Sequence, residues 1–139
     1  MTAPESRVAG LHGVVYVADL ARCTAFYAEL AGLDLVERDD GFVTLASSQV
    51  ELSLVRMSGL DADVDPDVDF EVDTARRTDA AVKLSFPVVS LAAVAERAPD
   101  LGGELDDPAT TWEFRGWRHR HGADPEGNVV SFREPSTRA

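Results

Sequence analysis

The sequence has little of several residues that would point to particular classes of protein. Its 139 residues include a single cysteine, Cys23, which cannot form a disulfide within the chain. The opening residues, through Arg7, lack the apolar stretch of a secretion signal. No apolar run approaches the roughly 20 residues of a membrane span. These absences predict a cytoplasmic protein.

Basic residues are also scarce, with 13 Lys and Arg against 25 Asp and Glu, for a formal charge of −12 at pH 7. Such a charge repels a phosphate backbone and an anionic membrane surface. We therefore expect neither nucleic acid nor a membrane as a partner. Apolar residues make up 45% of the chain, which is enough to form the core of one domain over residues 1–139.

An acidic segment is the one abrupt change in composition. Every odd position from 61 to 73 is Asp or Glu. This period of two, together with Pro66, favours an edge strand or an extended linker. A calcium loop beginning at Asp61 would need glycine and glutamate where the chain has Pro66 and Val72, so we do not expect a calcium site.

An internal repeat becomes visible when the chain is shifted by 71 residues. Residues 11–18 and 82–89 are both rich in strand-forming residues. Asp19 and Ser90 follow them as helix-capping residues, and each begins a helical stretch that a glycine ends. The aligned identical pairs are Val17 with Val88, Leu20 with Leu91, Ala21 with Ala92, Leu30 with Leu101 and Gly32 with Gly103.

Further strands are predicted after each helix. In the first half they cover 42–46 and 49–56, and in the second half 111–122 and 128–133. Residues 124–127 have Asp, Pro and Gly at the positions that a type I turn prefers, which closes a hairpin. Two copies of strand, helix and strands predict a single α+β domain. Within the first helix, Cys23 shares the apolar face, so we expect a buried thiol.

These residues together resemble the vicinal oxygen chelate superfamily, also called the glyoxalase/bleomycin resistance protein/dioxygenase family. The resemblance extends from residues 11–20 through Phe26-Tyr27 and Leu33 to the Asp-Pro-Glu-Gly-Asn turn and strand at 124–130. It implies two βαβββ modules that form curled mixed sheets around a central cavity, with the helices outside. Module one would cover about 8–57, the linker or edge strand about 58–80 and module two about 81–135. A homodimer is common in this family and is expected here.

The resemblance also tests for a metal site. Metal-dependent members take one ligand from the first strand and one from the last strand of each module. The matching positions hold His12, Glu51, Lys83 and Ser131. A protonated lysine repels a cation, and a serine hydroxyl is a poor substitute for a carboxylate. Half of the metal site is therefore missing, and we expect no cofactor.

Lys83 is notable even apart from the family resemblance, since it is the only lysine in the chain, which has 12 arginines. Strand alternation groups it with Ser85 and Pro87, so its amine is predicted to face the cavity, paired with Glu51 or a ligand anion. The alternative is an amine that reaches solvent at the start of the strand. Glu51 and His12 have structural alternatives too. Glu51 could be a partner of His12 or Lys83, and His12 could be a neutral histidine that is hydrogen-bonded between the curled sheets.

The segment 112–121 breaks the apolar alternation expected of a core strand, as residues at binding sites often do. Trp117, His119 and His121 fall on one face, which the resemblance places toward the cavity. The opposite face carries Arg118 and Arg120. The alternative is a solvated edge hairpin with arginines extending to water.

The expected function is metal-independent binding of a small molecule with an anionic or carbonyl oxygen, either to sequester an antibiotic or to handle a metabolite. A cationic ligand, attracted by the overall acidity, is the competing expectation. No catalytic residue is assigned, and metal-free acid–base chemistry at a histidine stays open. The alternative is an enzyme of the lyase or oxidoreductase type with a divalent metal ion held by His12, Glu51 and either His119 or His121. The expected ligand-binding residues are His12, Tyr16, Glu51, Lys83, Trp117, His119, His121 and Ser131, with Trp112 and Arg133 as further candidates.

Overall fold

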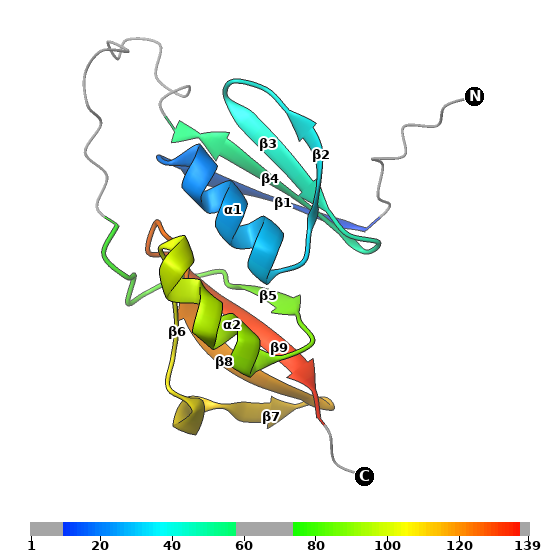
Figure 1. Ribbon diagram of the computed structural model, residues 1–139, viewed down its shortest axis with the longest axis vertical. Helices are drawn as coiled ribbons and strands as arrows, with labels where there is room; N and C mark the ends of the chain where they lie inside the picture. Colours follow the sequence, from blue (N-terminus) through cyan, green and yellow to red (C-terminus); the bar gives the residue numbers. More distant parts are fainter. Residues whose placement is uncertain (1–9, 58–73, 137–139) are drawn as a thin grey trace.

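Each half of the chain forms one sheet with one helix against it in the computed structural model (Figure 1), which describes residues 10–57 and 74–136. The acidic segment 61–73 lies outside the described residues. The first half comprises β1 (Leu11–Val17), α1 (Leu20–Leu30), β2 (Asp34–Arg38), β3 (Phe42–Ala46) and β4 (Val50–Arg56). The second half comprises β5 (Leu84–Pro87), α2 (Leu91–Arg97), η2 (Ala98–Leu101), β6 (Glu104–Leu105), η3 (Pro108–Thr110), β7 (Trp112–Phe114), β8 (Trp117–Ala123) and β9 (Val129–Pro135).

Both sheets are mixed. The first has the order β1-β4-β3-β2, and the second has the order β5-β9-β8-β6, with β7 paired to β8. β1 runs parallel to β4, and β5 runs parallel to β9, while the other pairs are antiparallel. The predicted α+β class with two mixed sheets is confirmed. No helix among the described residues is long and apolar enough to cross a membrane.

Local sequence sets the ends of both helices. The Asp19 side chain accepts a hydrogen bond from the Arg22 amide at 3.0 Å and caps α1. Ser90 caps α2 in the same way through the Ala93 amide. The second helical stretch continues from α2 into the short 3-10 helix η2, which has Pro99 in its first turn. Gly102 follows η2 with a left-handed φ of 86°.

The segment predicted as one strand over 111–122 is two strands, and this prediction was wrong. Arg115 and Gly116 have φ of 56° and 85°, which form a tight turn between β7 and β8. The edge-hairpin alternative is wrong for β8, because β9 pairs with it on one side and β6 and β7 on the other. Arg120 is only 5% exposed and its Nε donates to the Thr111 hydroxyl at 2.9 Å, so it does not extend to water.

One apolar core spans both halves. Phe26 and Tyr27 of α1 contact Phe86 of β5 and Phe132 of β9 through a chain of tilted and edge-on ring contacts, with centroids 5.1 to 6.2 Å apart. Cys23 is fully buried in the same core, as predicted. Burial and the nearby carboxylates raise the pKa of its thiol far above its ordinary value, which disfavours the reactive thiolate.

Two buried carboxylates join the halves at the predicted 124–127 turn, which the Gly127 amide closes by donating to the Asp124 carbonyl at 3.0 Å. The Tyr27 hydroxyl donates to Asp124 at 2.5 Å. Glu126 accepts from the amides of Ala18 and Asp19 at 2.9 and 3.1 Å, where β1 leads into α1. The turn of the second half therefore holds the start of the first helix.

Candidate functional site

A cationic and aromatic cluster lies on the face of the second sheet that points away from the core. The Lys83 Nζ is 2.6 Å from His121 Nε2 and 5.1 Å from the ring centroid of Trp112. Trp112 stacks on His119, its register partner across β7 and β8, with centroids 5.2 Å apart. Within the described parts of the chain, no carboxylate forms an ion pair with Lys83. The partners of the ammonium are therefore aromatic rings.

His121 is the acceptor in this contact. Burial lowers its pKa below the ordinary value, and the Lys83 charge lowers it further. Asp106 opposes these effects, whereas Arg76 and His119 add to them. Arg76 is largely engaged by Asp106, to which it donates two hydrogen bonds. A neutral imidazole with an unprotonated Nε2 can accept a hydrogen bond from the Lys83 ammonium.

A second cation, Arg133, lies on the same face of the sheet, on β9. Its guanidinium is 4.8 Å from the Trp117 ring centroid and donates to the Ser85 carbonyl at 2.9 Å and hydroxyl at 3.0 Å. Ser131 pairs with Ser85 across β5 and β9, but it is only 1% exposed and its Oγ is 3.5 Å from the Ser85 Oγ. Ser131 therefore lies beneath the site rather than at its surface.

The polar residues of the first sheet form a separate row. His12 Nε2 is 2.9 Å from the Ser53 hydroxyl, which is 2.8 Å from the Thr44 hydroxyl. Glu51 is the register partner of His12 across β1 and β4, yet its side chain makes no hydrogen bond or ion pair with any described residue. Tyr16 is 47% exposed on the same strand face as His12.

Glu51 and Lys83 line one cavity of about 290 Å³ where the two sheets meet. Ser85 and Arg133 also line it, between apolar walls that include Leu11 and Phe86. Of the eight ligand-binding residues that the sequence predicts, Glu51 and Lys83 are the two that line this cavity. The imidazole of His12 points instead to Ser53, and Lys83 pairs with His121 rather than with Glu51.

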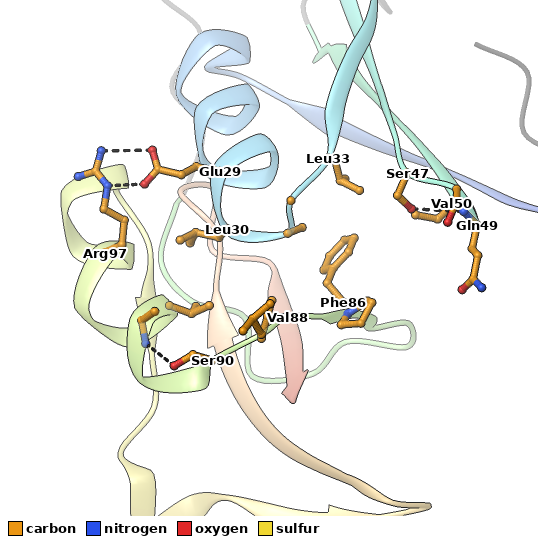
Figure 2. Close-up of a pocket in the computed structure, with 17 residues that line it drawn as sticks. Glu29, Leu30, Leu33, Ser47, Gln49, Val50, Phe86, Val88, Ser90 and Arg97 are labelled. Carbon is orange, nitrogen blue, oxygen red and sulfur yellow. Dashed lines mark hydrogen bonds and ion pairs between the residues drawn. The ribbon is translucent and has the colours of Figure 1, made fainter. Parts of the chain in front are cut away.

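A larger cavity of about 670 Å³ adjoins the first, and Figure 2 shows its lining. Its apolar walls come from the end of α1 and from the β5–α2 connection, while the turn between β3 and β4 adds polar groups. Glu29 and Arg97 form an ion pair at its margin (Figure 2). Both cavities share five lining residues, Ser47, Gln49, Val50, Phe86 and Pro87. No pattern in the sequence pointed to this second cavity, because its lining residues are ordinary core and loop residues.

The donor set does not fit a divalent metal. No group of three His, Cys, Asp or Glu in residues 10–57 and 74–136 is arranged to hold one. At the positions that the family resemblance assigns to ligands, Lys83 contributes an ammonium and Ser131 a buried hydroxyl. The His119 ring Nε2 donates to the Phe114 carbonyl at 3.3 Å, and the ring stacks on Trp112.

The fold is that of glyoxalase-like proteins. The model of the family described as glyoxalase-like domain matches residues 12–132, and the chain therefore belongs to this family, within the vicinal oxygen chelate superfamily that the sequence resembles. The comparison with curated proteins gives no significant match.

Solved structures with the same fold share little sequence with this chain. A glyoxalase/bleomycin resistance protein/dioxygenase family enzyme from Burkholderia phytofirmans PsJN is 17% identical, with a TM-score of 0.62 over 89% of this chain and 96% of that chain. A glyoxalase/bleomycin resistance protein from Streptomyces sp. CB03234 is 22% identical, with a TM-score of 0.56 over 89% and 98%. A glyoxalase-related enzyme from Fulvimarina pelagi is 20% identical, with a TM-score of 0.62 over 93% and 88%.

Proposed function

We propose that this protein binds a small organic anion without a metal ion, in the cytoplasm and as a homodimer. The observation that carries the proposal is the Lys83 ammonium, which has ring partners and no carboxylate among the described residues. A cation without a counter-charge can gain an oxyanion as a new partner. Arg133 adds a second positive charge at the shared cavity.

Local charge at this site opposes the charge of the whole protein. The net charge of −12 lowers the concentration of anions near most of the surface. Lys83, Arg133 and the aromatic rings nevertheless gather on one sheet face. This arrangement supports an anionic ligand with an aromatic or apolar body over a cationic ligand. Sequestration of such a molecule needs no catalytic group, and we assign none.

A matched pair of probes tests the proposal. We expect 3-phenylpropanoate to bind at least about tenfold more tightly than the neutral 3-phenylpropanamide, because only the acid offers a charge to Lys83 and Arg133. Isothermal titration calorimetry on the full chain, with and without a chelator, measures both affinities. Equal affinities for acid and amide would contradict the anion proposal, and loss of binding on chelation would favour the metal-dependent alternative.

Binding is also expected to take up protons. The free His121 has a lowered pKa, and a bound carboxylate would raise it, so affinity for 3-phenylpropanoate should increase as pH falls from about 8 to about 6. Titrations in two buffers with different ionisation heats measure the proton uptake directly. The uptake should disappear in His121→Gln. Affinity that falls over this interval would contradict the assigned role of His121.

A further inference from the structure

The smaller cavity presents opposite charges from its two sides. Glu51 comes from β4 of the first sheet, while Lys83 precedes β5 and Arg133 lies on β9 of the second. The Lys83 and Arg133 side chains already have partners on their own sheet. Glu51 therefore lines the same cavity as two cations, yet among the described residues it forms an ion pair with neither of them. A ligand placed between the sheets would meet a carboxylate on one side and cations on the other.

Glu51 is the group that the anion proposal leaves unexplained. Its side chain is partly buried, and it makes no hydrogen bond or ion pair within the described residues. His12, the adjacent residue on β1, is engaged by Ser53. A carboxylate without a partner can gain a cation or a hydrogen-bond donor as a new partner. A simple anion bound at Lys83 and Arg133 would leave Glu51 without a partner.

The adjoining cavity has a different character. Its walls include Leu30, Leu33, Phe86 and Val94, and its two charged residues, Glu29 and Arg97, pair with each other. Figure 2 shows Leu30, Leu33 and Phe86 around the open space. An apolar group placed there would gain by leaving water.

We propose that the ligand is a small zwitterion with an apolar tail, such as an amino acid with an aromatic or aliphatic side chain. This inference rests on the proposed function and adds a second recognition element to it. The ligand carboxylate binds Lys83 and Arg133, the ligand ammonium binds Glu51, and the tail occupies the larger cavity.

Three probes with the same phenyl tail separate these contributions. Phenylalanine carries both charges, 3-phenylpropanoate lacks the amine, and 2-phenylethylamine lacks the carboxylate. By calorimetry on the full chain, we expect phenylalanine to bind at least about tenfold more tightly than either of the other two. In Glu51→Gln this advantage over 3-phenylpropanoate should disappear. The matched control Glu37→Gln, which removes an exposed carboxylate from β2, should retain it.

The outcomes distinguish the two proposals. If 3-phenylpropanoate binds and phenylalanine binds no more tightly, the zwitterion inference is overturned and the anion proposal stands. If neither probe binds, both are overturned. The comparison of probes on the unaltered protein stays decisive even if Glu51→Gln fails to fold. An advantage of phenylalanine that persists in a folded Glu51→Gln would also overturn the assignment of Glu51.

Discussion

Replacing Lys83 with glutamate is expected to weaken binding of 3-phenylpropanoate by about 100-fold or more, because a hydrogen-bonded charge pair becomes a repulsive one. Lys83 is exposed and lies just before β5, so the change should leave the fold intact. Lys83 is the only lysine in the chain, and its ammonium forms no ion pair with a carboxylate among residues 10–57 and 74–136. Calorimetry gives the affinity, and thermal unfolding gives the stability.

The control for charge alone is Lys83→Arg. A guanidinium keeps the positive charge, although its planar shape does not reproduce the amine contact with His121. We expect this variant to stay within about tenfold of the original affinity. Binding that is unchanged in Lys83→Glu, or tightened, would instead support the competing cationic ligand.

Replacing Glu126 with alanine is expected to lower the free energy of unfolding by about 3 kcal/mol or more, because two backbone amides lose their buried carboxylate acceptor. Glu126 is 4% exposed and accepts from the amides of Ala18 and Asp19. Its loss also removes the link between the 124–127 turn and the start of α1. Urea unfolding followed by circular dichroism measures the change.

Glu96→Ala is the matched control, since Glu96 is exposed on α2 and has no partner among the described residues. It should change the free energy of unfolding by no more than about 0.5 kcal/mol. A Glu126→Ala variant that loses less than about 1 kcal/mol would show that water or a shifted backbone replaces the carboxylate. The proposed link between the two halves would then be unnecessary for stability.

Much of the fold could be predicted because it follows from local signals. The capping residues Asp19 and Ser90 begin helices, and the 124–127 turn has the residues that its geometry needs. The repeat of 71 residues indicated two similar halves. What local signals missed were the short strands β2 and β6 and the break between β7 and β8. Two to five residues give too little periodicity, and the Arg115-Gly116 turn interrupts a run of strand-forming aromatic and basic residues.

The site was less predictable than the fold. Alternation predicts which side chains share a face of a strand, which is why Lys83 was grouped with Ser85, and His121 with Trp117 and His119. It does not determine which neighbour each side chain chooses, since that depends on how two sheets are placed in three dimensions. His12 therefore contacts Ser53 rather than Glu51, and Lys83 contacts His121. The pair of Arg76 and Asp106 beside His121 gave no signal, because those residues are 30 positions apart.

A crystal structure of the protein with bound 3-phenylpropanoate is the most direct test of the central claim that a cationic site between the sheets holds an organic anion. The account predicts a carboxylate oxygen within about 3.2 Å of the Lys83 Nζ or the Arg133 guanidinium. The phenyl ring should then lie against apolar lining residues. A carboxylate bound at a divalent metal ion, or at a surface away from both residues, would contradict the account.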